Sequence, residues 1–487
     1  MKPSLSLGLL VCVGLLSPVG GCAKPKAPPA VVDVVAPQVD RLGPIPTAGV
    51  EVAFTLPIPI ETKLSNGVSV WTIPNGTLPI VTVDIVVPGG TALDPVGKEG
   101  TAALAATLMT KGAGKRDATA FAEEVERLGV ELESSVDTES AHVTLSCNRD
   151  VLSAALDLAA DAILRPSFTA GDFAREQDLA LADLESSYDE PAWLAERTAM
   201  SLWFGLAHPY GRPDDGTLAG LKKTVNTDVK AWWKRAWNAS AATVTLSGAI
   251  TAEDATSLLE ARLGAWKATT SGLVAVPPAP AHADAPYYLV DKPGSAQTAF
   301  YIAFPGVAFG DMHGAPLRTG AIALGGTFTS RLNHLLREVR GYTYGVKAGL
   351  VEFHHGGISV VRSRIRTDVT APALTDLLAE FERAHAGIDD AESLKARGSY
   401  RQDVVQEMET RAGTTSTFSA YHAEGMPISA LSADMAAMRA VTTADVTPAL
   451  AAFDRKKAVV VLVGDRAVIE PALRAAGYAN IEVVTAP

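Results

Sequence analysis

Cysteine is scarce in this sequence, with three residues among 487. Cys12 and Cys22 lie within the first 22 residues, so Cys147 is the one thiol in the rest of the chain. A single thiol cannot form an intrachain disulfide, which excludes a disulfide-stabilised scaffold. Apolar and polar residues alternate over residues 141–147. We therefore interpret Cys147 as a buried side chain on a strand and not as a nucleophile.

Excess positive charge and two common motifs are missing as well. The sequence has 42 Lys and Arg residues against 54 Asp and Glu residues, a net charge of −12. No basic patch with interleaved aromatic residues occurs, so a nucleic-acid partner is not expected. A Gly-rich phosphate loop and a GxSxG nucleophile elbow are also absent.

The sequence contains no zinc-binding helix motif. Its nine histidines are scattered, and none forms HExxH or HxxEH. His354 and His355 are the only close pair. We interpret them as neighbours on a strand, whose side chains point to opposite faces and so do not share a metal ion. We therefore predict that this chain binds no metal cofactor.

The N-terminus reads as an export signal. Lys2 is followed by an apolar run over residues 5–16 that is too short to span a bilayer. Residues 19–22 read Val-Gly-Gly-Cys, which resembles a bacterial lipobox, and Ala23 fits sorting to the outer membrane. We predict a signal peptide over residues 1–22, lipidation of Cys22 and an outer-membrane location facing the periplasm. An ordinary cleaved signal with an incidental cysteine is the alternative.

Two proline-rich stretches predict the domain boundaries. Residues 23–50 are rich in Pro and Ala, which favours an extended tether. Prolines 277, 278 and 280 indicate an exposed linker over residues 271–285. We therefore predict a first domain over residues 51–270 and a second over residues 286–487.

The two domains show the same order of elements. Each opens with strands, continues with helices and closes on a strand that ends at a glycine, Gly248 or Gly464. This order predicts a duplicated α+β fold, with each half a mixed sheet covered by helices. The main helices are expected at 100–109, 119–128, 151–164, 171–188, 192–203, 313–323, 330–339, 370–385, 391–409 and 414–423.

Several segments resemble the pitrilysin/insulinase family of zinc peptidases. Residues 207–213 read Ala-His-Pro-Tyr-Gly-Arg-Pro, residues 290–294 read Val-Asp-Lys-Pro-Gly, and residues 330–344 run from Ser-Arg-Leu to Gly-Tyr-Thr-Tyr. Their order and spacing are similar to those of the family over roughly residues 55–470. The resemblance implies two homologous halves of the mitochondrial-processing-peptidase type.

The resemblance also implies a lost zinc site. Active members carry HxxEH on the first long helix, where residues i and i+4 share a face and hold the metal. The histidines would fall at Ala103 and Thr107 and the general-base glutamate at Ala106. The third ligand, a glutamate, corresponds to Asp183, whose alternative role is that of a solvated helix-face residue. Methyl groups and one hydroxyl cannot hold zinc, so we predict no catalytic residues in this chain.

An arginine and a tyrosine of the second half remain. In the family these two residues reach into the catalytic chamber, and here they correspond to Arg337 and Tyr344. Both can donate hydrogen bonds to a peptide carbonyl and to its oxyanion. The alternative is an arginine on a solvated helix end and a tyrosine packed in a sheet.

The predicted function follows from this combination. The chain is expected to be the non-catalytic subunit of a heterodimeric, membrane-anchored zinc metalloendopeptidase that acts on peptide substrates. A homologous partner would carry the zinc motif and the zinc. The alternative is a structural or peptide-binding lipoprotein with no role in proteolysis. Independent hydrolysis by this chain has no support in the sequence.

Overall fold

The computed structural model describes residues 53–268 and 276–487. The predicted signal peptide, Cys22 and the tether lie outside the described residues, as do residues 271–275 of the predicted linker. Residues Phe54–Pro487 form one compact unit. Within the described ranges, no helix has the length and apolar character needed to cross a membrane.

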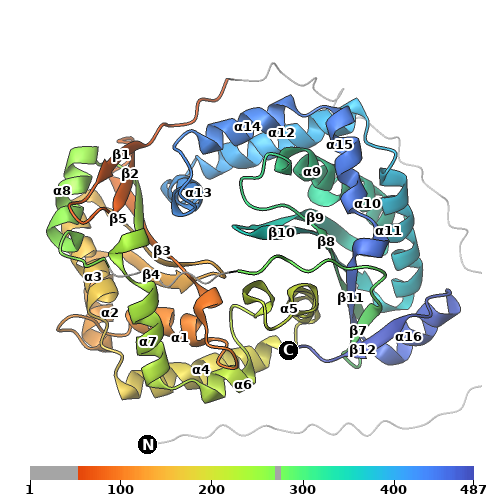
Figure 1. Cartoon of the computed structure of the whole chain (residues 1–487), viewed down its shortest axis with the longest axis horizontal. Coiled ribbons are helices and arrows are strands. Elements are labelled where there is room, and N and C mark those ends of the chain that lie inside the picture. The colour runs from red at the N-terminus through yellow and green to blue at the C-terminus, as the bar shows by residue number, and fades with distance from the viewer. Residues whose placement is uncertain (1–52, 269–275) are drawn as a thin grey trace, which may run out of the picture. The chain divides into compact units, whose positions relative to one another are not determined.

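A six-stranded mixed sheet forms the centre of the first half (Figure 1). Its strand order is β1-β2-β6-β3-β5-β4, with β6 parallel to β2 and every other pairing antiparallel. The central strand β3 is buried at seven successive positions, as expected for a strand with both sheet faces covered. The strands are β1 Ile60–Lys63, β2 Ser69–Pro74, β3 Ile80–Pro88, β4 Glu131–Val136, β5 Ser140–Asn148 and β6 Thr243–Gly248.

Helices cover this sheet and line its edges. The amphipathic helix over residues 118–128 begins at Asp117, whose side chain accepts from the Ala120 amide, and ends at the left-handed Gly129 (φ 63°). The helices are α1 Thr101–Met109, α2 Ala118–Leu128, α3 Leu152–Leu164, α4 Ala170–Ser187, α5 Pro191–Phe204, α6 Leu218–Lys223, α7 Asn226–Ala236 and α8 Ala252–Leu263.

The second half repeats this architecture. Its sheet has the order β12-β7-β11-β8-β10-β9, with β11 and β12 both parallel to β7. The strands are β7 Tyr287–Asp291, β8 Gln297–Pro305, β9 Thr343–Phe353, β10 Gly356–Arg366, β11 Val459–Gly464 and β12 Ile481–Val484. The helices are α9 Gly314–Ala321, α10 Arg331–Asn333, α11 Thr370–Ala384, α12 Asp390–Glu407, α13 Arg411–Ala423, α14 Ala430–Ala440, α15 Thr443–Ala449 and α16 Arg466–Ala475.

The predicted fold class, two mixed α/β halves each built on a sheet covered by helices, is confirmed. The two sheets differ only in the sixth strand. β1 comes from the start of the described chain and pairs antiparallel with β2, whereas β12 comes from the end and pairs parallel with β7. Each half also continues beyond its closing glycine into a helix, α8 or α16. These two helices were not predicted from the sequence.

The halves exchange one helix each (Figure 1). α5 belongs to the first half but packs on β8 and β11 of the second sheet, and α13 of the second half packs on β3 and β6 of the first sheet. The α5 interface is an apolar cluster that includes Leu194, Ala199 and Tyr301. The α13 interface combines an apolar cluster of Phe418 with Trp71 and Ile73 with buried hydrogen bonds from Thr415 and Ser419, so the two halves are joined by contacts of different chemistry.

One local prediction is wrong, and a second is confirmed with a change of helix type. His354 and His355 lie in the turn between β9 and β10, not on a strand, and their rings meet edge to face at 4.5 Å. The helix expected over residues 330–339 changes to π-helix at His334–Val339. The wider turn rotates the apolar stripe, so Val339 is exposed although Leu332 and Leu336 are buried.

Candidate functional site

Helix α1 stands where the family's zinc helix would be. Its start is fixed by Asp94, whose carboxylate accepts from the backbone amides of Gly100 and Ala102, both at 2.7 Å. Gly100 has φ 102°, a conformation that favours glycine. Burial raises the pKa of Asp94 to about 7, against the opposing effect of these two hydrogen bonds.

The predicted zinc-motif positions on α1 show no metal-binding chemistry. Ala106 is buried, Ala103 is half-buried and Thr107 is exposed. The Thr107 hydroxyl donates to the Ala103 carbonyl at 3.0 Å, so it serves the helix itself. These positions present two methyl groups and an engaged hydroxyl, which do not fit a zinc ion.

Asp183 does not complete a ligand set. It lies exposed on α4, the helix that packs against α1, and its backbone carbonyl accepts from the Ser187 hydroxyl at 2.9 Å. Across residues 53–268 and 276–487, no group of three His, Cys, Asp or Glu side chains is arranged to hold a metal ion. The first half therefore retains the scaffold of the site without its chemistry.

The histidine-proline motif of the first half has a structural role in this chain. Arg212 donates to the Asp94 carbonyl at 2.7 Å, which ties the motif to the start of α1. His208 accepts from the Tyr210 amide at 3.1 Å and bonds the Pro277 carbonyl at 2.9 Å through its other ring nitrogen. Tyr210 donates its hydroxyl to Glu139. The motif thus frames the lost site and anchors the segment that leads into the second half.

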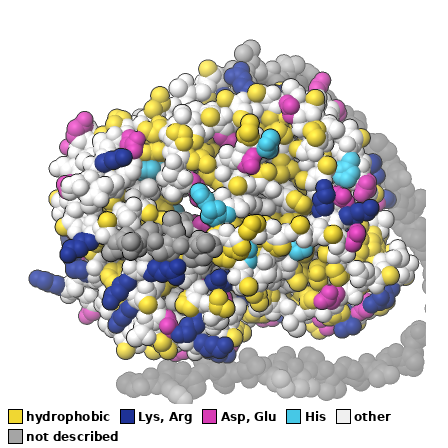
Figure 2. Space-filling model, in the orientation of Figure 1, with side chains coloured by type: hydrophobic (Ala, Val, Ile, Leu, Met, Phe, Trp, Pro, Cys, Tyr) yellow, Lys and Arg dark blue, Asp and Glu magenta, His cyan; other side chains and the backbone are white. Residues whose placement is uncertain are grey.

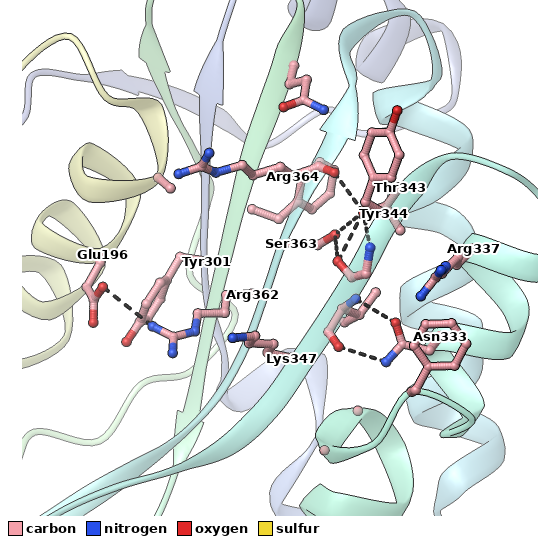
Figure 3. Close-up of a pocket in the computed structure, with 18 of the residues that line it drawn as sticks. Glu196, Tyr301, Asn333, Arg337, Thr343, Tyr344, Lys347, Arg362, Ser363 and Arg364 are labelled. Carbon is pink, nitrogen blue, oxygen red and sulfur yellow. Dashed lines mark hydrogen bonds and ion pairs between the residues drawn. The ribbon is translucent and has the colours of Figure 1, made fainter.

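A large cavity in the second half contains the predicted arginine and tyrosine (Figure 3). Its volume is about 940 Å³, and its walls come from α5, β8, β9, β10 and the π-helix. Arg337 enters the cavity from the π-helix His334–Val339, and Tyr344 enters it from the edge strand β9. The Arg337 guanidinium lies 3.7 Å from the centre of the Phe328 ring, and its Nε lies 3.4 Å from Glu338.

Tyr344 is not packed in the sheet. Its side chain is 89% exposed, and Phe328 beside Arg337 is 60% exposed. Large exposed aromatic side chains contribute little to the stability of the fold that carries them. Their presence at one cavity indicates a surface available for a ligand or a partner.

Asn333 positions this part of the cavity and was not foreseen from the sequence. Its amide nitrogen donates to the Thr327 and Val346 carbonyls at 2.9 and 2.8 Å, and its amide oxygen accepts from the Val346 amide at 2.8 Å. It therefore ties the helix that carries Arg337 to the strand that carries Tyr344. The signal available in the sequence was a lone amide inside an apolar helical stripe, between Leu332 and Leu336.

Three further basic residues of the cavity were also missed. Lys347 lies on β9, and Arg362 and Arg364 lie on β10. Arg362 is 3.7 Å from Glu196 of α5. Alternate basic residues over 362–366 were visible in the sequence as Arg-Ser-Arg-Ile-Arg, the period of one strand face.

A second cavity, of about 550 Å³, lies between the halves and holds the histidine pair. Figure 2 shows histidine side chains near the middle of this face, where the surface is hollowed. Glu139 accepts from the Tyr210 hydroxyl and from the His354 amide, and His354 pairs with Glu424. Burial raises the pKa of Glu139. Its two hydrogen bonds, to Tyr210 of the first half and His354 of the second, join the halves.

Comparisons with known proteins agree with this geometry. Residues 70–207 match the model "Insulinase (Peptidase family M16)", and residues 225–400 match "Peptidase M16 inactive domain". An uncharacterized zinc protease of Mycobacterium leprae is 26% identical over 310 residues, which is 62% of this chain and 68% of that protein. A probable mitochondrial-processing peptidase subunit beta of Arabidopsis thaliana is 26% identical over 270 residues, 54% and 50% of the two chains.

Solved structures show the same fold. The peptidase M16 inactive domain from Pseudomonas fluorescens superposes with a TM-score of 0.77 at 24% identity, over 84% of this chain and 98% of that one. The two matched models and the shared fold cover both halves. The chain therefore belongs to the pitrilysin/insulinase family, peptidase family M16, as a member of the non-catalytic type in which methyl groups and a hydroxyl stand at the zinc-motif positions.

Proposed function

We propose that this chain is the non-catalytic subunit of a heterodimeric zinc peptidase and donates Arg337 and Tyr344 to the active site of a zinc-bearing homologous partner. The observation that carries the proposal is the exposure of Tyr344, which is 89% exposed beside a cavity that also holds Arg337. Tyr344 adds little buried contact to its own half, and the Arg337 side chain, which is 31% exposed, stacks on Phe328 at the same cavity, so both groups are placed to act on a bound peptide.

The edge strand supplies a way to hold that peptide. Among the described strands, β9 pairs only with β10; on its other edge Asn333 bonds the Val346 amide and carbonyl, and the rest of that edge has no strand partner. An extended peptide can add to such an edge through main-chain hydrogen bonds. Its carbonyl groups would then lie beside Tyr344 at the start of the strand. A phenol and a guanidinium at that place can stabilise the oxyanion that forms during hydrolysis.

The division of labour between the two chains follows from the first half. The zinc and the general base would belong to the partner, because Ala103, Ala106 and Thr107 offer no ligand atoms suited to zinc. This chain would bind and orient the peptide and donate the two hydrogen bonds.

The test is reconstitution with a homologue that carries HxxEH, ideally one encoded beside this gene. Peptide hydrolysis should require both chains, and metal analysis should find zinc in the partner alone. Full hydrolysis by the partner without this chain would contradict the proposal. A stable complex without any hydrolysis would favour the alternative of a structural or peptide-binding lipoprotein.

Anchoring is a separate part of the proposal. Lipidation of Cys22 would hold the complex at the outer membrane, facing the periplasm. The support is the lipobox-like sequence at residues 19–22. Cys22→Ser should abolish labelling with a fatty-acid analogue and move the protein to the soluble fraction. An unchanged membrane fraction would remove this part and leave the subunit proposal intact.

A further inference from the structure

We propose that the cavity around Arg337 and Tyr344 selects peptides with acidic side chains at alternate positions. The selecting surface is a basic face made of Lys347 on β9 with Arg362 and Arg364 on β10 (Figure 3). The inference rests on the proposed function in one respect, namely that the ligand is an extended peptide on the edge of β9.

The three side chains lie on one face of the sheet. Lys347 and Arg362 are direct cross-strand partners, so their side chains point the same way. Arg362 and Arg364 are two residues apart on a strand and share that face as well. Tyr301 of β8 is the partner of Arg362 on its other side, which places the basic face toward α5.

This arrangement is unfavourable for the fold alone. Like charges directly opposite each other destabilise a sheet. Arg362 and Arg364 are only weakly compensated, by Glu196 at 3.7 Å and Glu190 at 3.8 Å, and all four side chains are at least half exposed. Lys347 forms no ion pair with any described residue. A ligand that brings negative charge would relieve the repulsion.

The charge of the cavity contrasts with that of the chain. Among the residues that the structure describes, four cationic side chains and one carboxylate, that of Glu196, line it. The whole protein carries a net charge of −12. A cavity of one sign with apolar walls concentrates ligands of the opposite sign. The charge complementarity therefore points to an acidic peptide.

The backbone of β9 leaves room for such a peptide to reach the arginines. Gly345 and Gly349 flank Lys347 at the positions two residues away, which share its face. A methyl group added at Gly349 would meet nothing within 4 Å, and one at Gly345 would meet only Asn333, at 3.5 Å. The absence of side chains there exposes the basic face to the neighbouring strand.

The register of an added strand sets the expected sequence pattern. Successive side chains of a strand alternate between faces, so every second peptide residue would face Lys347 and the arginines. The residues between them would face the other side, toward the helix layer. A peptide with Glu at alternate positions should therefore bind more tightly than one with the same number of Glu residues placed side by side.

The experiment measures binding of fluorescent peptides to the full chain by anisotropy, without a catalytic partner. The peptides have one neutral scaffold and carry alternate Glu, adjacent Glu, alternate Lys or no charge. We expect the order alternate Glu, adjacent Glu, neutral, Lys. Raising the ionic strength from about 0.05 M to about 0.5 M should strongly weaken the binding of the Glu peptides and of no other peptide.

Two matched triple variants localise the effect. Lys347→Gln with Arg362→Gln and Arg364→Gln should weaken the alternate-Glu peptide about tenfold and leave the neutral peptide unchanged. Lys222→Gln with Lys223→Gln and Lys230→Gln removes the same charge from α6 and α7 and should have little effect. Lys347→Gln alone, at an exposed residue, should weaken binding about two- to fivefold and serves if the triple variant folds poorly.

The outcomes separate this inference from the proposed function. Equal binding of Glu and Lys peptides, or equal losses in the two triple variants, would overturn acidic selection. Capture of a folded acidic protein in place of the peptides would also overturn it, because the basic face would then be a protein interface. Hydrolysis in the reconstituted complex depends on Arg337 and Tyr344 and can succeed or fail independently of these results.

Discussion

The two halves of this protein share a fold and differ in what their equivalent edges carry. In the first half, α1 beside the edge strand β4 presents Ala103, Ala106 and Thr107. In the second half, the edge strand β9 and the adjacent helix present Arg337, Tyr344 and Lys347 around an open cavity. The fold therefore does not depend on either site, because the same sheet forms with a methyl surface or with a charged one.

The two exchanged helices make a second contrast between the halves. α5 meets the second sheet through apolar side chains, whereas α13 adds buried hydrogen bonds to an apolar cluster on the first sheet. Ser419 donates to Asp84 at 2.6 Å, and Ser247 bonds Thr415 at 2.8 Å. His422 stacks on Trp71 with ring centres 4.2 Å apart. An apolar interface tolerates small shifts, but a hydrogen-bonded one requires a single arrangement.

The largest expected effect comes from placing a charge in the apolar interface. Ala199 on α5 is fully buried, so Ala199→Asp should lower the free energy of unfolding by about 3–5 kcal/mol because the carboxylate has no partner there. Denaturant unfolding measures this change. Ala182→Asp on the exposed face of α4 is the control and should change stability by less than about 0.5 kcal/mol. Equal effects would mean that α5 does not pack as described.

The second prediction concerns the retained pair. In the reconstituted complex, Arg337→Ala and Tyr344→Phe should each lower kcat about 10²- to 10³-fold with a smaller change in KM, because each removes a donor to the oxyanion. Steady-state kinetics on a peptide substrate measures both constants. Arg340→Ala is the matched control, since Arg340 lies at the end of the same helix but pairs with Asp376 at 2.8 Å. A kcat that is unaffected in both variants would remove the functional contrast between the halves.

The third prediction uses the α13 interface. Burial lowers the pKa of His422 to about 4, and its ring bonds Thr245 at 3.0 Å and Ser69 at 2.8 Å. The unfolded chain therefore binds a proton at this residue between about pH 6.5 and pH 4 that the folded chain does not. Stability should fall as the pH falls through this window, by up to about 3 kcal/mol.

His422→Gln should flatten that slope in denaturant titrations across the same window. His313→Gln, at an exposed residue, should leave the slope unchanged. A contrasting response comes from His142, whose side chain is 22% exposed. Burial opposes the charge of His142, but hydrogen bonds to Asp137 and Asp84 raise its pKa to about 10. The stability that the charged ring contributes to the fold is therefore complete below about pH 6.5 and is lost as the pH rises through 10.

The smallest expected effect concerns Phe328, which stacks under Arg337. Phe328→Ala should lower kcat of the complex about three- to tenfold, because the guanidinium loses its cation–π support. Phe328→Trp should restore activity, whereas stability should remain within about 0.5 kcal/mol because the side chain is largely exposed. A loss of stability in place of a loss of turnover would show that Phe328 acts in the fold and not through Arg337.

The sequence predicts the regular parts of this fold well. Amphipathic periods and terminal glycines located α2 and the helices and strands that repeat in each half, because local hydrophobic patterns decide those elements. The pairing of β12 with β7 and the exchange of α5 and α13 could not be predicted, since they depend on contacts between residues far apart in the chain. The change to π-helix at His334–Val339 also lacks a local signal.

The candidate site was predicted in part. The motif segments predict the pair Arg337 and Tyr344, and both residues line one cavity. Asn333 and the basic face were missed, because a cavity joins side chains from separate strands and a helix, and their proximity is a property of the tertiary structure. Asp94 was missed for the same reason, since its role in fixing α1 follows from a loop that folds back onto the helix.

The exchange of α5 and α13 has a consequence for limited proteolysis. The segment over residues 276–285 joins the halves without regular secondary structure, so it is a natural place for a protease to nick the chain. Because each fragment would keep one helix seated on the sheet of the other, the nicked protein should migrate as two bands under denaturing conditions and elute as one species from a gel-filtration column.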